Sequence, residues 1–422
     1  MAGIYIHIPF CRRKCHYCNF FSLASQKYQG SFLLSLKKEI VLTRKYLAGD
    51  QINTIYFGGG TPSLYMPLAL QEVMEMIAST HDFSPAGTAS PSGLSPTREC
   101  PTPGPSPNRG GGNTSPPDPS PPGEGRIVIP ATLEITLELN PDDVTEEYVA
   151  ELKQTWFNRF SLGVQSFSDE DLAYLNRSHS AGQSIRAVKL LQDAGFENIS
   201  IDLIYGIPSS TASQWRRNLE TAFSLEIPHI SAYALTVEPK TPLAWMIGKQ
   251  KTVPVSDEFQ ADQYKILMQA TRDHGFLQYE ISNFCKPSRQ AIHNTNYWNG
   301  ITYLGLGPSA HSYNGASRRW NVSNLTQYIL GIEKSESICE EELLTSMQKY
   351  NEYVMTSLRT MWGCGLEKKI YELRITNYES VMKSAVSFVQ QGLLTERAGV
   401  YFLTDEGKLF ADRIASELFV AE

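Results

Sequence analysis

The sequence predicts an α/β protein with a parallel sheet and a smaller, helical C-terminal domain. In the first 240 residues, short apolar runs alternate with amphipathic helical stretches about six times. Repeated right-handed β-α-β crossovers build a parallel sheet. With six such units the sheet can be a partial barrel, a full barrel or a doubly wound open sheet.

The apolar runs and the periodic segments between them define the expected elements. The predicted strands are residues 4–8, 54–57, 133–139, 159–163, 199–203 and 229–235, and the clearest helices cover 32–47 and 185–194. The stretches CRRKCHYC, GGGTP, ELNPDD, GVQSF and DLIYGIP each follow a strand. The C-terminal ends of barrel strands converge on one mouth. We therefore expect these stretches to share one site.

Residues 84–125 interrupt this pattern with a segment rich in Pro, Gly and Ser, which contains half of the 24 prolines. Such a composition cannot offset the entropy of ordering, so the sequence predicts a disordered insertion on the face opposite the mouth. Cys100 lies inside it. A tethered ligand is conceivable, but we interpret Cys100 as an incidental thiol.

The alternation ends at about residue 325. Helical runs at 345–361 and 379–391 lead to two β-like runs around residues 397–399 and a final helix over 405–418. Helices followed by a hairpin and a helix resemble a winged helix. The expected domains are a barrel core at 1–240, a barrel-capping extension at 241–325 and a winged-helix-like domain at 326–422.

Composition limits the classes of partner and location. The chain has 422 residues and a net charge of -7, and its C-terminal domain lacks a basic stripe, so we expect no nucleic-acid partner. No apolar run approaches the roughly 20 residues of a transmembrane helix. The N-terminus lacks the layout of a signal peptide. We therefore expect a cytoplasmic protein whose clustered cysteines bind metal in a reducing compartment.

Three of the seven cysteines, Cys11, Cys15 and Cys18, have a C-x3-C-x2-C spacing. A structural zinc site requires four ligands, and the remaining cysteines are isolated. His16 lies between the thiols and could be a fourth ligand, or it could equally point outward. Iron-sulfur clusters normally use one thiolate per iron, so three thiolates on a four-iron cluster leave one iron open to an external ligand.

CRRKCHYC after one strand and GGGTP after the next resemble the radical S-adenosylmethionine (SAM) superfamily. The resemblance implies a partial (β/α)6 TIM-like barrel and a 4Fe-4S cluster held by the three cysteines. It also implies SAM on the open iron, an external electron donor and cleavage to a 5'-deoxyadenosyl radical. A glycine-rich turn suits this site, because it lets backbone groups approach a ligand closely.

Further motifs narrow the resemblance. IYIHIPFC, YFGGGTPSL, ELNPDD, FSLGVQSF, LNRSHS and IDLIYGIP occur in the order found in the oxygen-independent coproporphyrinogen III oxidase branch, and are most similar to its HemW-like heme chaperones. The resemblance places Tyr5, Gly59 and Glu138 at SAM, with Glu138 on the ribose hydroxyls. It implies that a second set helps to hold a second SAM: Tyr17, Gly60, Thr61, Gln165, Arg177 and Asp202.

Each of these polar residues also has a structural interpretation. Gln165 and Asp202 could satisfy backbone groups at strand ends, and Arg177 could form a surface ion pair. Their occurrence as an ordered set favours the binding site.

Two departures from the oxidase pattern favour the chaperone group. The oxidase has a further Cys two residues after the third, where this chain has Phe20. It also has an N-terminal extension that contributes to its active site, whereas here the first strand is expected from Ile4. We therefore expect no decarboxylation of coproporphyrinogen III, which remains the alternative function.

HNTNYW, at residues 293–298, resembles the H-N-x-x-Y-W stretch that is associated with heme in the HemW-like branch. A neutral imidazole is a good axial ligand for heme iron, and aromatic rings suit a porphyrin edge. His293 is thus a candidate ligand, with His311 and Cys285 as competitors and a hydrogen-bonded core histidine as the alternative. The resemblance implies delivery of heme to client hemoproteins, membrane hemoproteins among them, and assembly as a homodimer.

Overall fold

The computed structural model describes residues 1–47, 49–81, 83, 129–376 and 378–420. The predicted insertion at 84–125, which includes Cys100, lies outside the described residues. No helix among the described residues combines the length and apolar character that crossing a bilayer requires.

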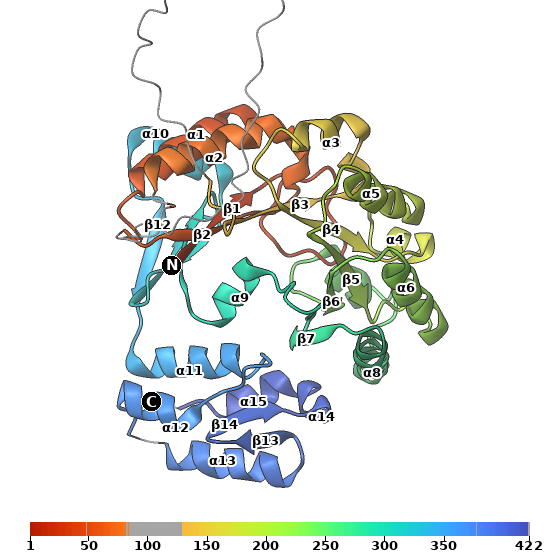
Figure 1. The fold of residues 1–422 in the computed structure, drawn as a ribbon, viewed down its shortest axis with the longest axis vertical. Helices are drawn as coiled ribbons and strands as arrows, with labels where there is room; N and C mark the ends of the chain where they lie inside the picture. Colours follow the sequence, from red (N-terminus) through yellow and green to blue (C-terminus); the bar gives the residue numbers. More distant parts are fainter. Residues whose placement is uncertain (48, 82, 84–128, 377, 421–422) are drawn as a thin grey trace, which may run out of the picture.

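Six parallel strands form the centre of the fold, each paired with the next, and confirm the six predicted strands. They are β1 (Ala2–Ile8), β2 (Ile52–Gly59), β3 (Glu134–Leu139), β4 (Arg159–Gln165), β5 (Ile199–Tyr205) and β6 (His229–Ala234). Helices cover their outer face (Figure 1): α1 (Gln29–Leu42), α2 (Pro67–Thr80), α3 (Glu146–Leu152), α4 (Asp169–Tyr174), α5 (Ala181–Asp193) and α6 (Ala212–Ser224). The predicted partial barrel is confirmed.

The sheet continues beyond the barrel strands at both ends. Next to β1 lies the parallel β9 (Thr302–Leu306), followed by β10 (His311–Tyr313), β11 (Ser317–Asn321) and β12 (Cys339–Leu343), all antiparallel. Beside β6 lie β8 (Asn283–Cys285) and β7 (Leu277–Glu280), also antiparallel. Among the described strands, β12 and β7 are the two edges of this sheet, so the barrel stays open. The intervening helices are α7 (Pro242–Gly248), α8 (Asp257–Asp273), α9 (Ile292–Trp298) and α10 (Leu325–Lys334).

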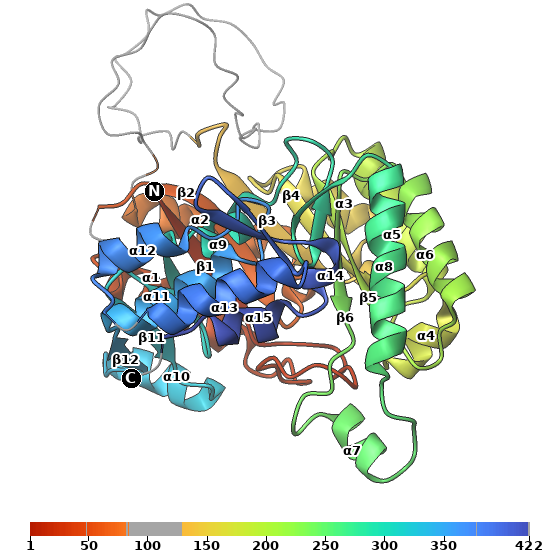
Figure 2. The same cartoon turned by 90° about the horizontal axis from the view of Figure 1, so that it is seen from below.

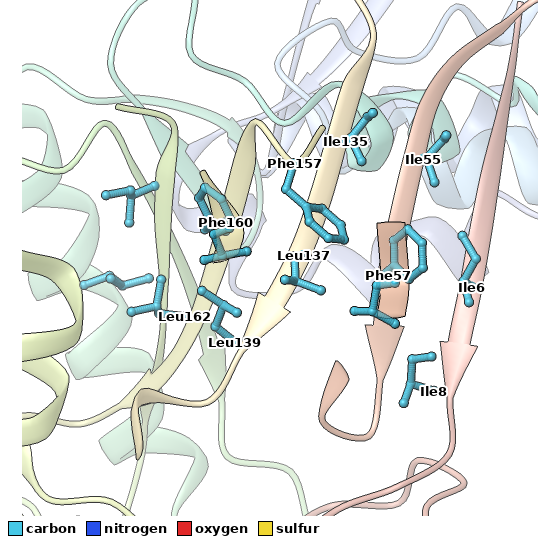
Figure 3. Packing of buried hydrophobic residues seen from close by; sticks show 14 of the residues in the cluster. Ile6, Ile8, Ile55, Phe57, Ile135, Leu137, Leu139, Phe157, Phe160 and Leu162 are labelled. Carbon is cyan, nitrogen blue, oxygen red and sulfur yellow. The ribbon is translucent and has the colours of Figure 1, made fainter. Parts of the chain in front are cut away.

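The two faces of the parallel strands differ in polarity. Apolar side chains such as Ile6, Phe57, Leu137 and Leu162 belong to the main core (Figure 3). Successive strand residues point to opposite faces. The alternate positions therefore point into the barrel, and many are polar: His7, Thr54, Tyr56, Thr136, Glu138, Ser161, Asp202 and Ser231. The hydrophobic core thus lies between the sheet and its helices, which leaves a polar barrel interior.

The C-terminal unit has its own core, which includes Tyr350, Leu366, Phe388 and Ile414. Its helices α11 (Ser346–Ser357), α12 (Leu366–Leu373) and α13 (Glu379–Gln390) precede the hairpin of β13 (Leu394–Arg397) and β14 (Val400–Leu403). The helix expected over 405–418 is instead two helices, α14 (Asp405–Lys408) and α15 (Ala411–Glu417). Residues 326–344 supply α10 and β12 to the barrel part, so the separate core begins with α11.

The C-terminal unit docks on the open side of the curved sheet, with α9 between them (Figures 1 and 2). The Ile281 N–H donates to the Arg359 carbonyl at 3.1 Å, and the Met361 N–H donates to the Tyr279 carbonyl at 3.0 Å. These backbone bonds satisfy groups at the β7 edge, which an unpaired edge strand would leave exposed.

Phe57→Ala should test the outer core. Phe57 is fully buried and meets Phe157 edge to face, with ring centroids 5.3 Å apart. Its truncation leaves a cavity and should lower the free energy of unfolding by about 3–5 kcal/mol. Leu34→Ala on α1 is the control, because this side chain is 72% exposed and its loss should change stability by about 0.5 kcal/mol or less. Urea unfolding of both variants measures the difference, and equal effects would contradict this account of the core.

Candidate functional site

The cysteine loop follows β1 directly and is fixed by neighbouring loops. The Cys11 N–H donates to the Leu23 carbonyl at 3.0 Å, and the Asn176 amide donates to the Lys14 carbonyl at 2.8 Å. His16 is held by its ring as well, since Nδ1 lies 2.8 Å from the Tyr174 carbonyl oxygen. The ring of His16 is thus engaged with backbone beside the loop.

The glycine turn after β2 is hydrogen-bonded to the chain that enters the cysteine loop. The Gly60 N–H donates to the Ile8 carbonyl at 2.8 Å, and the Thr61 N–H donates to the Phe10 carbonyl at 2.6 Å. Gly59 has φ +106°, and a Cβ there would meet the ring of His7. Glycine is therefore required at this position, both for its backbone conformation and for the close approach.

Asp143 joins three of the predicted motifs. Its Oδ1 accepts from Arg12 Nε at 2.8 Å, and its Oδ2 accepts from Ser63 Oγ at 2.6 Å. Ser63 Oγ in turn accepts from the Asn140 N–H at 3.0 Å. Burial raises the pKa of Asp143, while the hydrogen bonds from Ser63 and the charge of Arg12 oppose that shift. The cysteine loop, the glycine turn and ELNPDD are thereby held together.

Arg177 reaches the cysteine loop from the segment that follows β4. Its Nη1 lies 3.4 Å from Cys15 Sγ, and its Nη2 donates to the Gly163 carbonyl at 2.8 Å and to Asn140 Oδ1. The side chain is therefore part of the site and does not form a surface ion pair. Gly163 leaves room for it, because a Cβ there would lie 3.1 Å from Arg177 Nη2 and 3.0 Å from Gln165 Nε2. Gln165 itself has φ +66°, an uncommon conformation for a residue with a side chain.

Two half-buried carboxylates lie on β3 and β5, the strands on either side of β4. Glu138 Oε1 accepts from the Tyr56 hydroxyl at 2.7 Å, and Oε2 accepts from the Gly59 N–H at 3.2 Å. Burial raises the pKa of Glu138 to about 7, against the opposing hydrogen bond from Tyr56. Asp202 accepts from Ser161 Oγ at 3.2 and 3.3 Å, and burial raises its pKa to about 6.

These groups line one cavity with a volume of about 1130 Å³. Its wall on the barrel side includes Cys11, Cys15, Tyr17, Cys18, Gly59, Gly60, Thr61, Glu138, Gln165, Arg177 and Asp202. The C-terminal unit supplies further lining, including Arg359, Lys408, Phe410 and Arg413. Pockets for one drug-sized ligand measure roughly 300–1,000 Å³. The cavity therefore has room for more than one ligand.

The donor set of this cavity fits an iron-sulfur cluster. Among the described residues, no three His, Cys, Asp or Glu side chains are grouped closely enough to hold a single metal ion. The three thiols nevertheless line the same cavity, and Arg177 donates a hydrogen bond to one of them. A multi-iron cluster matches this arrangement, because each thiolate binds a different iron.

Two of the predicted binding residues do not line the cavity. Tyr5 is not among its lining residues, and the Tyr5 hydroxyl is 3.1 Å from His7 Nδ1. His293 is only 2% exposed, and both of its ring nitrogens are engaged, Nδ1 with Thr54 Oγ1 at 2.8 Å and Nε2 with the Tyr297 hydroxyl at 2.9 Å. Binding iron through this ring would break one of these bonds.

Among the other candidate heme ligands, Cys285 is fully buried in β8 and His311 is exposed on β10. Neither residue lines the cavity.

Several residues of the site had no predicted role, among them Tyr56, Ser63, Asn140 and Asp143. These four lie in or beside the quoted motifs YFGGGTPSL and ELNPDD. The strand alternation could have identified Tyr56, because it occupies the same face as Gly58 and Thr54. The contacts of Ser63 and Asp143 join loops 80 residues apart, and no local pattern reveals them.

Comparisons with known proteins agree with this geometry. Residues 5–222 match the Radical SAM superfamily. The chain is 30% identical over 420 residues to the heme chaperone HemW of Bacillus subtilis, covering 98% of each chain. It is 28% identical to the heme chaperone HemW of Escherichia coli, covering 100% of this chain and 98% of that one.

A solved structure shares the fold over nearly the whole chain. Coproporphyrinogen III oxidase (HemN) from Escherichia coli, a radical SAM enzyme, aligns with a TM-score of 0.77 and 19% identity, covering 99% of this chain and 90% of that one. Taken with the full-length match to HemW, these findings show that the chain belongs to the radical SAM superfamily and, within it, to the HemW family.

Proposed function

We propose that this protein is a heme chaperone that binds a 4Fe-4S cluster, SAM and heme, and that delivers heme to hemoproteins. The observation that carries the proposal is the full-length match to proteins named heme chaperone HemW. The radical SAM family implies the cluster and SAM. Heme and its delivery to client hemoproteins are inferred from the relatives' name, and membrane association of these clients is an expectation from the family resemblance.

The barrel half of the cavity is our proposed site for the cluster and SAM. Cys11, Cys15 and Cys18 would hold the cluster, with Arg177 beside Cys15. When bound, the cluster supplies the electron that cleaves the sulfonium of SAM. The glycine turn would bring backbone groups to the methionine end, and Glu138 would accept hydrogen bonds from the ribose. Tyr17, Gln165 and Asp202 would line the remaining space.

Heme is proposed to occupy the part of the cavity nearest the C-terminal unit. Phe410 is 46% exposed and offers an aromatic face to a porphyrin. Lys408 and Arg413 line the same region and could pair with propionate groups, as cationic side chains do with carboxylates. This location leaves the barrel half free for SAM.

Phe20 supports the chaperone over the oxidase alternative. It occupies the position at which the oxidase pattern has a further cysteine, and it lies 63% exposed in the cavity wall. An aromatic ring there offers apolar contact but no thiol. An external electron donor, a cytoplasmic location and a homodimer complete the proposal as expectations from the family resemblance.

Cys15→Ser should prevent cluster assembly. Serine removes the soft thiolate that iron-sulfur clusters use, so anaerobic reconstitution should leave the variant with few irons while the wild type takes about four. Cys339→Ser is the matched control, because Cys339 lies on β12, away from the cavity. Iron and sulfide content measure the outcome. Equal iron loading in wild type and Cys15→Ser would contradict the cluster assignment.

SAM affinity should fall as the pH decreases through the raised pKa of Glu138. A protonated Glu138 is a poorer acceptor for the ribose hydroxyls, and the pKa of about 7 centres this loss near neutrality. Between pH 8 and pH 6 the ionised fraction, and with it the affinity, should drop about tenfold. Equilibrium dialysis of the reconstituted protein measures it. Glu138→Gln should abolish most of this pH dependence, and an unchanged slope would remove Glu138 from the ribose site.

Heme binding and coproporphyrinogen conversion distinguish the two functions. We expect a Soret band on heme titration and no protoporphyrinogen from coproporphyrinogen III, SAM and a reductant. Phe410→Ala should weaken heme binding roughly three- to tenfold, the effect of losing one aromatic contact. Tyr371→Ala, which removes an 88% exposed ring of the same unit, is the control. Protoporphyrinogen formation would overturn the chaperone proposal in favour of the oxidase.

A further inference from the structure

The HNTNYW helix α9 lies on the open side of the sheet (Figure 1) and contacts β1 and β2, the strands that lead into the cysteine loop and the glycine turn. Its first two N–H groups, of Ile292 and His293, donate to the Glu134 carboxylate at 3.0 and 2.8 Å. Glu134 begins β3, the strand that ends at Glu138 and Leu139. The helix is thus fixed to a strand of the binding site through its backbone.

The His293 side chain completes this attachment. Thr54 on β2 and Tyr297 on α9 engage its two nitrogens, and burial lowers its pKa to about 3, so the ring is neutral. A neutral imidazole has one donor and one acceptor nitrogen, so both of its hydrogen-bonding sites are used here. In this arrangement the ring works as a structural link between α9 and β2.

The ring of His293 supports Tyr56, whose hydroxyl binds Glu138. The two rings are stacked, with centroids 5.0 Å apart and an angle of 27° between planes. The ring of Tyr5 also lies 6.1 Å from that of Tyr56, at an angle of 32° between planes. Tyr56 thus packs against two aromatic rings, and its hydroxyl donates to Glu138 Oε1 at 2.7 Å.

Two glycines leave the space that this chain of contacts occupies. A Cβ on Gly3 would lie 2.9 Å from Thr54 Oγ1 and 3.2 Å from the His293 ring. A Cβ on Gly58 would lie 2.7 Å from Tyr56 Cε1 and 2.9 Å from Glu138 Oε1. A side chain at Gly3 would displace Thr54 or His293, and a side chain at Gly58 would displace Tyr56 or Glu138. Glycine at these two positions of β1 and β2 thus makes room for the contacts that connect His293 with Glu138.

We propose that His293 is a positioning residue of the SAM site, which acts through Tyr56 to orient the Glu138 carboxylate. The HNTNYW motif then stabilises the barrel half of the cavity, where SAM is proposed to bind. Heme binds without an axial bond from His293. The inference rests on the proposed role of Glu138 at the ribose.

Tyr56→Phe is the sharpest test, because it removes one hydroxyl and keeps the stacked ring. SAM affinity of the anaerobically reconstituted protein should fall roughly three- to tenfold, the effect of losing one hydrogen bond. His293→Gln should weaken SAM binding by a comparable factor, and neither variant should change the heme Soret band or heme affinity. Tyr371→Phe makes the same chemical change on the exposed surface of α12 and should leave SAM affinity unchanged.

The outcomes separate this inference from the proposed function. If Glu138→Gln weakens SAM binding but Tyr56→Phe does not, the positioning role is wrong and the ribose role stands. If Glu138→Gln has no effect on SAM affinity, both are wrong. A His293→Gln variant that loses the Soret band but keeps its SAM affinity would identify His293 as the heme ligand. If His293→Gln does not fold, as judged by thermal unfolding, Tyr56→Phe alone decides the inference.

Discussion

The contacts of one carboxylate, that of Asp143, bring together the loops on which the site depends. Arg12 belongs to the cysteine loop, Ser63 to the segment after the glycine turn, and Asp143 to the segment after β3. Parallel strands bring such loops to one end of the barrel, but they do not fix the loops relative to one another. Asp143 does so over separations of 131 and 80 residues. Its burial makes these bonds costly to lose, since a buried carboxylate needs its partners.

The cavity is a product of both parts of the chain. Barrel strands contribute thiols, carboxylates and glycine backbone, whereas the C-terminal unit contributes cations and the ring of Phe410. Backbone bonds at the β7 edge hold that unit in place, and Arg359 of the unit adds an ion pair with Glu280 of β7 at 3.4 Å. The C-terminal unit therefore forms one wall of the cavity.

The sequence predicts the elements of this fold better than their long-range contacts. Apolar runs identified β1 to β6, because period and strand length are local properties. The pairing of β9 with β1 joins residues 300 positions apart and left no such signal. Among site residues, the cysteines and the glycine turn have distinctive spacing, and most of the residues taken from the family resemblance line one cavity. For His293 the motif indicates a functional histidine but not its contacts. The hydrogen bond between His293 and Thr54 spans 239 residues and forms only in the folded chain.

The separation of apolar and polar strand faces has a consequence for how this protein can change. Side chains that point outward, such as Phe57, carry the packing between sheet and helices, whereas those that point inward carry little of it. Substitutions inside the barrel can therefore alter which molecules the cavity accepts without dismantling the shell around it. A barrel of this kind can exchange one chemistry for another while its architecture persists, and the common fold of this chain and an oxidase with 19% identity is an instance of that tolerance.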